Sequence, residues 1–293
     1  MATVADAVAE LERLYPPVLA ESWDAVGLVC GDPSADVRRV YFCVDVVTAT
    51  VDEAIGWAAD LVVAHHPLLL RGVHGVPTTT YKGRLVHRLI KHDLAVQVAH
   101  TNADVADPGV SDALAERIGL DDLRPLVPLR DDPLESPGLR GAGRVGTLRS
   151  TLSLREFVEL VAAALPATAA GIRASGDPDR PVRTVAVSGG AGDGYLGDAV
   201  RAGADAFVTA DLRHHPASEH VEAAGPALVD AAHWATERPW LDQVAAKLSA
   251  ALGPGSVATL VSDVVTDPWT LHTPQHPVAA DDRGGRGGDP ITS

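Results

Sequence analysis

The stretch LVVAHHP, Leu61–Pro67, is an apolar run of strand type that ends in two adjacent histidines and a proline. Two further stretches share this design, LAVQVAHTNAD (Leu94–Asp104) and ALVDAAHWATE (Ala227–Glu237). In each of them imidazole and carboxylate side chains follow the apolar run. Open α/β sheets place their ligands beyond the carboxyl ends of their strands. The three junctions therefore predict strand ends that meet at one polar site.

Strand and helix patterns alternate on both sides of this stretch. Predicted strands cover residues 37–46, 60–64, 94–99, 144–148, 182–188, 206–209 and 227–232, and predicted helices cover 4–14, 48–59, 82–92, 110–118, 153–164, 195–202 and 215–224. Strands that alternate with helices of roughly 10–15 residues are typical of a parallel sheet with helices on its faces. The expected fold class is α/β, with two α/β domains and mostly parallel sheets.

Changes in composition suggest how these domains follow one another. Residues 121–140 are rich in Pro, Asp and Gly, which predicts a linker or a long connection. Ligand-type residues return after the strand at 227–232, so we expect the first domain to be discontinuous. It would comprise residues 1–125 and 230–270 and bind metal, with a second domain at 141–229 inserted. Residues 271–293 have no periodicity and are predicted to be a disordered tail, in which His272 and His276 are uninvolved.

Charge and hydropathy exclude several classes of partner. The formal net charge of −15 argues against a nucleic-acid-binding surface, which needs clustered Lys and Arg. No apolar run approaches the roughly 18 residues of a membrane helix, and the N-terminus has no secretory signal pattern. We therefore expect a cytoplasmic protein without a membrane partner. The two cysteines, Cys30 and Cys43, do not make a disulfide framework.

The three junctions supply the ligands of a candidate metal site. A lone histidine is usually structural, but this set comprises three imidazoles and two carboxylates: His65, His66, Asp104, His233 and Glu237. His233 and Glu237 have i, i+4 spacing and would share one face of a helix. The two carboxylates can bridge two ions about 3.5–4 Å apart. The set suits two divalent ions, with Zn, Mn, Fe and Ni all acceptable.

Other polar residues have two interpretations each. His100 either faces the substrate as a proton shuttle or caps its strand, and Trp23-Asp24 either line a pocket or anchor the core. The glycine-rich loop Gly189–Gly194 is expected to be a tight strand–helix turn, with phosphate binding as the alternative. The cluster Asp211–His220 is expected to support the site or face the substrate, with a polar helix N-terminus as the alternative.

Six motifs in order resemble those of the Nif3 family, whose members are also described as GTP cyclohydrolase I type 2 homologues. They are WDAVGL (23–28), HHP (65–67), HTNAD (100–104), SGGAG (188–192), DLRHH (211–215) and HWATE (233–237). The resemblance spans roughly residues 5–270. It implies two α/β domains, a dinuclear metal centre held by the same five residues, and a toroidal homohexamer built as a trimer of dimers. Departures occur at Ala25, Ala210 and Pro216, and none of them is a predicted ligand.

The resemblance also implies a reaction. It points to a metal-dependent hydrolase that opens the imidazole ring of GTP or a related purine nucleotide and releases formate, with His100 and Glu237 as catalytic residues. Two alternatives use the same ligands. One is a metal-binding oligomeric interaction protein without turnover, and the other is a two-metal phosphoesterase or amidohydrolase of a different small substrate.

Overall fold

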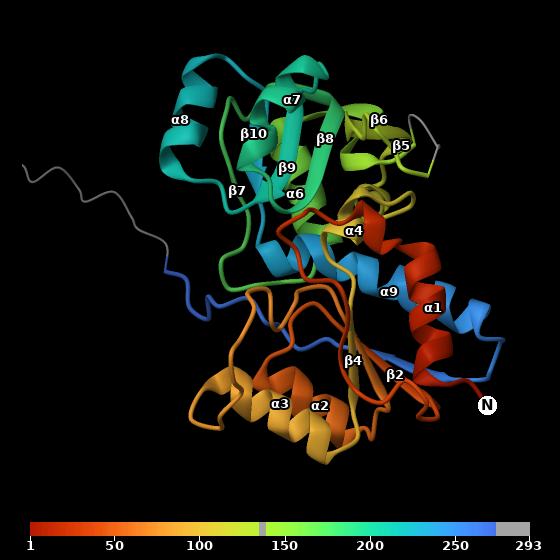
Figure 1. Cartoon of the computed structure of the whole chain (residues 1–293). Helices are drawn as coiled ribbons and strands as arrows, with labels where there is room; N and C mark the ends of the chain where they lie inside the picture. The colour runs from red at the N-terminus through yellow and green to blue at the C-terminus, as the bar shows by residue number, and fades with distance from the viewer. Residues whose placement is uncertain (135–138, 274–293) are drawn as a thin grey trace, which may run out of the picture.

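The computed structural model describes residues 1–134 and 139–273, which form two sheets and their helices (Figure 1). The first sheet has the strand order β1-β4-β3-β2-β11. Its strands are β1 (Gly27–Cys30), β2 (Arg39–Cys43), β3 (Leu61–Ala64), β4 (Ala95–Val98) and β11 (Ala258–Val261). All neighbouring pairs are parallel except β1 with β4. The last strand in sequence thus returns to the sheet that the first strands build.

The second sheet has the order β5-β6-β8-β9-β10-β7. Its strands are β5 (Asp121–Pro128), β6 (Gly141–Ser153), β7 (Arg173–Ala174), β8 (Pro181–Ala191), β9 (Ala206–Ala210) and β10 (Ala227–Asp230). Only β8, β9 and β10 run parallel to one another, and the remaining pairs are antiparallel. The fold is two-sheet α/β as expected, and its second sheet is mixed because the antiparallel strands β6 and β7 flank the parallel centre.

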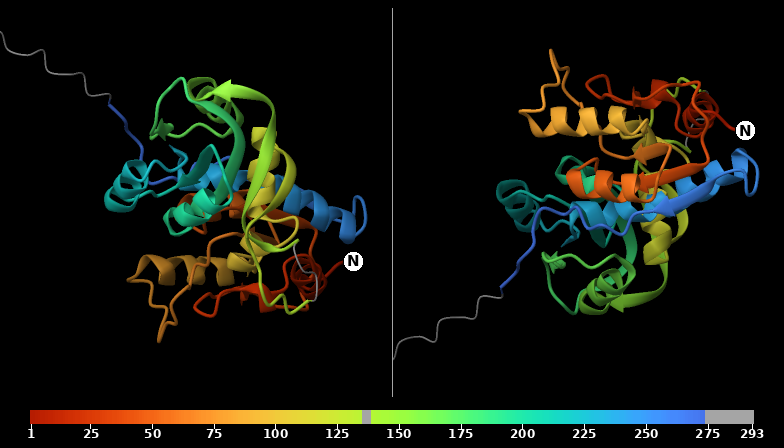
Figure 2. Two further views of the ribbon diagram at one scale, coloured as in Figure 1. Left: turned by 90° about the horizontal axis from the view of Figure 1, so that it is seen from above. Right: turned by 90° about the horizontal axis from the view of Figure 1, so that it is seen from below.

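The helices form layers around and between the sheets. They are α1 (Val4–Leu14), α2 (Thr48–Gly56), α3 (Tyr81–Lys91), α4 (Thr101–Val105), α5 (Val110–Ile118), α6 (Leu154–Ala164), α7 (Leu196–Arg201), α8 (His214–Glu222) and α9 (His233–Ala251), with short 3-10 turns at Pro17–Leu19 and Asp193–Tyr195. Helix α9 lies between the sheets and contacts β2 and β11 on one side and β8 and β9 on the other (Figures 1 and 2). Helices α2 and α3 cover the outer face of the first sheet, and α7 and α8 that of the second (Figure 1).

The strands divide their apolar residues between these layers with a period of two. In β9, Ala206 and Val208 face the central core, whereas Phe207 faces the layer of α7. In β3, Leu61 and Val63 face the same central core and Val62 faces α2 and α3. Successive side chains of a strand point to opposite faces, so a strand buried on both sides reads as a continuous apolar run.

Side-chain caps fix the starts of two helices, α1 and α6. The Thr3 hydroxyl accepts a hydrogen bond from the Asp6 backbone N–H at 3.2 Å, and the Asp6 carboxylate accepts one from the Thr3 N–H at 2.8 Å. Ser153 and Glu156 make the same reciprocal cap at the start of α6. Such capping boxes satisfy backbone N–H groups that a helix start leaves unpaired.

One sequence-based expectation about connections is wrong. Residues 121–140 are not only a linker, because Asp121–Pro128 form β5 and pair with β6. The proposed domain bounds remain a prediction, and β5 shows that the second sheet begins before residue 125.

The described residues also bear on the expected tail and on membrane insertion. Of residues 271–293, only 271–273 are described and carry no helix or strand, and the prediction for His276 lies outside the described residues. Over 1–134 and 139–273 there is no helix with the length and apolarity to span a bilayer.

Candidate metal centre

His65 and His66 follow β3 directly and turn their rings to the same place. Their backbone N–H groups continue the sheet, bonding the carbonyls of Cys43 at 3.2 Å and Val44 at 2.8 Å. The two ring centroids lie 4.9 Å apart. Nδ1 of His65 bonds the carbonyl of Ala99 at 3.0 Å. This leaves the Nε2 atom of His65 free to face donor atoms from other elements.

Asp104 lies in the short helix α4, which begins directly after β4 and His100. The side chain of Asn102 fixes this start, since its oxygen accepts the His100 N–H at 2.9 Å and its amide donates to the Tyr15 carbonyl at 2.7 Å. Asp104 Oδ1 is 3.6 Å from His65 Nε2. The loop after β4 therefore brings a carboxylate to the first histidine.

Glu237 lies at the middle of the cluster. It shares the first turns of α9 with His233, whose Nε2 is 3.0 Å from Glu237 Oε1. The same Oε1 is 3.4 Å from His65 Nε2, and Oε2 is 3.2 Å from His66 Nε2. The structure thus brings together all five predicted ligands, although their role in binding metal remains a prediction.

Two further carboxylates orient the outer imidazoles. Asp45, just after β2, accepts a hydrogen bond from Nδ1 of His66 at 2.8 Å. Asp211, just after β9, does the same for Nδ1 of His233 at 2.7 Å. Asp211 belongs to the predicted supporting cluster, whereas Asp45 was not predicted. A carboxylate on Nδ1 fixes the tautomer whose Nε2 can bind a metal.

The glycine-rich loop is a close approach of the backbone to this cluster. Gly190 has φ +64°, and a Cβ there would lie 2.4 Å from Glu237 Oε1 and 2.9 Å from His233 Nε2. The Thr236 hydroxyl accepts the Gly190 N–H at 2.9 Å, and Thr209 donates to the Gly190 carbonyl at 3.0 Å. The demand for glycine is therefore met inside β8, at an irregularity of its pairing with β9, and not in the strand–helix turn that was expected.

The pKa values of the cluster reflect burial and mutual charge. Burial lowers the pKa of the His66 imidazole, but the Glu237 and Asp45 carboxylates together outweigh burial and raise it well above its ordinary value. The same competition raises the pKa of His233 to about 9. Burial raises the pKa of the Asp104 carboxyl to about 6. Glu237 is also buried, yet the neighbouring imidazoles hold its pKa well below the usual range.

Two buried atoms in the cluster have no hydrogen-bond partner within 1–134 and 139–273, namely His65 Nε2 and Glu237 Oε2. Buried polar atoms in native proteins are nearly always satisfied, by protein, water or an ion. Ligand atoms of His66, His233 and Glu237 lie within 4.8 Å of one another, as do those of His65, His66 and His100. Converging imidazole and carboxylate donors with unsatisfied atoms fit a divalent transition metal.

His100 lies beside this cluster, with its ring centroid 5.1 Å from that of His65. Its Nδ1 is 2.9 Å from Asp24 Oδ1, and Asp24 Oδ2 accepts the Thr101 N–H at 3.0 Å. Burial, followed by the charge on His65, lowers the pKa of His100 to about 4. This pKa leaves the ring of His100 neutral at pH 7.

A cavity of about 310 Å³ opens onto the cluster. Both sheets contribute to its walls, which include Trp23, His100 and Tyr195 as well as the ligands His66, Asp104, His233 and Glu237. Trp23 is an exposed wall residue and not a core anchor. Ligand cavities of about 300–1,000 Å³ are usual for small molecules. A metal bound here would face a space that holds a small substrate.

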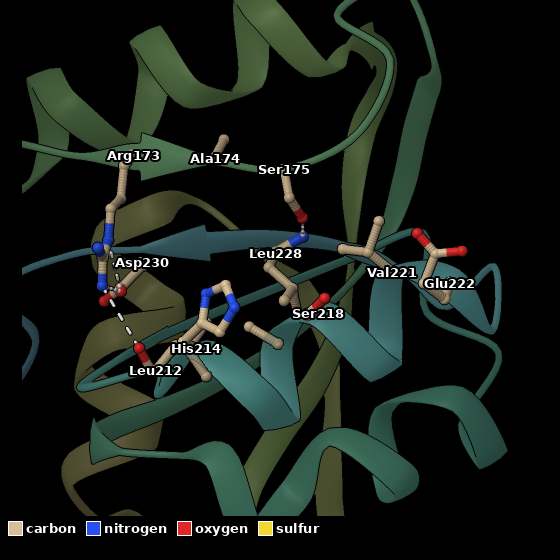
Figure 3. Close-up of a pocket in the computed structure, with 11 residues that line it drawn as sticks. Arg173, Ala174, Ser175, Leu212, His214, Ser218, Val221, Glu222, Leu228 and Asp230 are labelled. Carbon is tan, nitrogen blue, oxygen red and sulfur yellow. Dashed lines mark hydrogen bonds and ion pairs between the residues drawn. The ribbon is translucent and has the colours of Figure 1, made fainter.

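The rest of the Asp211–His220 cluster lies away from the metal ligands. His220 is buried, with Nε2 3.0 Å from the Pro226 carbonyl. His214 lines a separate cavity of about 420 Å³ between α8 and β7, where Arg173 pairs with Asp230 and contacts the Leu212 carbonyl (Figure 3). His220 is thus structural, His214 faces this second cavity, and His215 is exposed, with its ring centroid 5.2 Å from that of His214.

Comparison with known proteins agrees with the geometry. A family model described as Duf34/NIF3 (NGG1p interacting factor 3) matches residues 2–268. A Streptomyces coelicolor protein named GTP cyclohydrolase 1 type 2 homolog is 53% identical over 283 residues, covering 96% of this chain and 98% of that protein. A Mycobacterium tuberculosis protein with the same name is 37% identical, covering 92% of this chain and 97% of its own.

Solved structures resemble the whole two-sheet arrangement. A Bacillus cereus protein related to NIF3 superposes with a TM-score of 0.85 at 26% identity, over 93% of this chain and all of the other. A Staphylococcus aureus protein gives a TM-score of 0.83 at 27% identity, over 92% of this chain and 99% of the other.

Proposed function

Because the chain belongs to the Duf34/NIF3 family, we propose that it is a dinuclear-metal-dependent hydrolase acting on GTP or a related purine nucleotide. The convergence of His65, His66 and His233 on Glu237, with Asp104 next to His65 and a cavity of about 310 Å³ beside them, carries this proposal. A closed structural site would leave no room for a substrate, whereas catalytic sites keep an open position. The names of the relatives supply the substrate class.

The proposed roles follow from position. His65 and Asp104 would hold one ion, His66 and His233 the other, and the two oxygens of Glu237 would reach both. When bound, such a pair of ions supplies activated water at neutral pH and stabilises developing negative charge. Glu237 is catalytic in this scheme because it holds both ions at the reacting atoms.

His100 would move the proton. Its Nδ1 is held by Asp24, so its Nε2 carries the lone pair and can accept a proton from a group in the cavity. Its neutral ring at pH 7 is in the correct form to act as acceptor. Substitution of His100 by Gln is expected to lower turnover and to leave the metal content unchanged.

Formate release from GTP tests the proposal. The full chain is freed of metal, reconstituted with Mn, Fe or Zn, and assayed beside Asp104→Ala and Glu237→Gln. We expect release by the wild type with at least one metal, and loss in both variants. No release by protein with two confirmed ions would overturn the cyclohydrolase proposal. It would favour the non-catalytic metal-binding protein, and turnover of a phosphoester or amide panel would favour the other hydrolase.

A further inference from the structure

The five ligands divide into two unlike half-sites, and this inference rests on the proposed metal centre. The first, here called the nitrogen-rich half-site, consists of His66, His233 and Glu237, whose ligand atoms lie 3.0–3.3 Å apart. The second, the oxygen-rich half-site, consists of His65, Asp104 and Glu237, at 3.4–3.6 Å. Two imidazoles favour Zn or Ni, whereas carboxylate oxygens also accept Mn or Mg.

Both imidazoles of the nitrogen-rich half-site are fixed by carboxylates. Asp45 Oδ1 holds Nδ1 of His66 at 2.8 Å, and its Oδ2 accepts a hydrogen bond from the Thr266 hydroxyl. Thr266 lies in the segment after β11, which runs back along the molecule from that strand (Figure 2). The chain therefore uses a residue more than 200 positions away to brace the partner of a single ligand.

Asp211 fixes His233 from a constrained backbone. Its carboxylate is 2.7 Å from His233 Nδ1, and its φ of +56° lies in the left-handed region that non-glycine residues adopt at a cost. The preceding Ala210 ends β9, so this conformation turns the side chain back towards α9. An unfavourable backbone angle at this position serves the contact with the imidazole.

The oxygen-rich half-site has a weaker arrangement around its single imidazole. Nδ1 of His65 bonds only the neutral carbonyl of Ala99, at 3.0 Å. A carbonyl orients the ring but adds no negative charge near the ion. Carboxylate partners fix the ring and strengthen it as a ligand, and their loss typically costs roughly 10–100-fold in metal affinity.

We propose that the nitrogen-rich half-site binds zinc first and more tightly, and that Asp45, Asp211 and Thr266 are the positioning residues responsible. The oxygen-rich half-site then takes the second ion with lower affinity. The dinuclear centre is thus assembled in a fixed order and can hold two different metals. Its second ion is the exchangeable one.

Zinc titration of the metal-free full chain against a chromophoric chelator tests this order. We expect two resolved dissociation constants for the wild type. Asp45→Asn and Asp211→Asn should weaken the first by roughly 10–100-fold and the second by less than about threefold. Asp104→Asn should abolish the second alone. Thr266→Val should weaken the first by a smaller factor, and Thr266→Ser should restore it.

Asp230→Asn is the matched control, because Asp230 lies in the same region but pairs with Arg173 instead of a histidine ligand. It should leave both constants unchanged. Thermal unfolding of each metal-free variant checks that the fold is retained. Equal weakening of both constants by Asp45→Asn and Asp211→Asn, or no weakening, would overturn the inference while leaving the hydrolase proposal intact. Two resolved zinc dissociation constants without formate release would support this inference and overturn the hydrolase proposal.

Discussion

Gly190 carries the sharpest steric constraint on the candidate site. Its backbone lies so close to the cluster that a Cβ would overlap Glu237 Oε1 and crowd His233 Nε2. We expect Gly190→Ala to push both ligands apart and lower zinc affinity by at least about tenfold, comparable to losing a ligand-orienting contact. Gly194→Ala is the control, since its Cβ would meet nothing within 4 Å. Equal zinc affinities for the two variants by chelator competition would contradict the expectation.

The charge on His233 sets a pH dependence of the metal-free protein. Its folded-state pKa of about 9 exceeds its ordinary value of 6.5, so the folded protein binds this proton more strongly than the unfolded chain does. The resulting stabilisation is complete below pH 6.5 and is lost as pH rises through 9. Urea unfolding of metal-free protein should therefore give a lower free energy of unfolding at pH 9 than at pH 6.5. Zinc affinity should change in the opposite direction over the same window, because the ion displaces this proton.

His233→Gln separates this residue from other titrating groups. It should reduce the difference in unfolding free energy between the two pH values, and the remainder is expected from His66, whose pKa is also raised well above its ordinary value. A variant whose difference equals that of the wild type would show that another group carries the dependence.

The ligands could be predicted from sequence because each follows an apolar run, and parallel strands bring such ends to one edge. His65, Asp104 and His233 are of this kind. Asp45 was missed because the predicted strand ran on to Val46, whereas β2 ends at Cys43. The pairing of Asp211 with His233 could not be predicted, because the two residues follow different strands, β9 and β10. The contact depends on the left-handed backbone angle of Asp211.

Arg144 joins β6 to α5 and to the end of α4, the helix that carries Asp104. The guanidinium is buried, binds Asp112 of α5 at 2.6 Å and donates to the carbonyls of Ala106, at 2.6 Å, and Gly143, at 2.7 Å. Removing one partner of a buried ion pair strands a charge and typically costs about 3–5 kcal/mol. We expect this loss for Arg144→Ala in denaturant unfolding.

Arg149→Ala is the matched surface control for this prediction. Arg149 is on the same strand and pairs with Asp121 at 3.1 Å, but its side chain is 85% exposed. Exposed pairs contribute about 0–1 kcal/mol. A loss of similar size in the two variants would show that burial of the Arg144 pair is unimportant.

The elements that sequence patterns predicted are those buried on both faces. Strands β3, β4 and β9 are wholly buried, and their residues are apolar except for Gln97 and Thr209. Strand β5 was assigned to a linker because DDLRPLVP contains two prolines and charged residues, and most of its side chains are not buried. Edge strands such as β7 and β11 form backbone hydrogen bonds with a neighbouring strand that the sequence does not reveal. Their hydrophobic pattern therefore predicts them poorly.

At the scale of the whole molecule, the resemblance to the Nif3 family predicts a homohexamer. Light scattering at micromolar concentration should then give six times the chain mass of 30.4 kDa. A monomer mass would count against the toroid. Dilution of the same sample separates a stable assembly from one that concentration maintains, because mass action dissociates the latter.

The two sheets share one core, which predicts how the molecule unfolds. The central apolar cluster includes Phe42 of β2, Val208 of β9 and Trp240 of α9, so α9 is packed by both sheets at once. Opening either sheet would expose the apolar side of α9 that this sheet covers, and burial of such surface is the main stabilising contribution. We therefore expect the metal-free chain to unfold in a single calorimetric transition, with equal van't Hoff and calorimetric enthalpies. Two transitions would show that the second sheet is stable on its own. Trp240→Ala should then lower only the transition temperature of the sheet that depends on α9. If the two sheets share one core, Trp240→Ala lowers the temperature of the single transition, because all the elements in contact with α9 lose packing together.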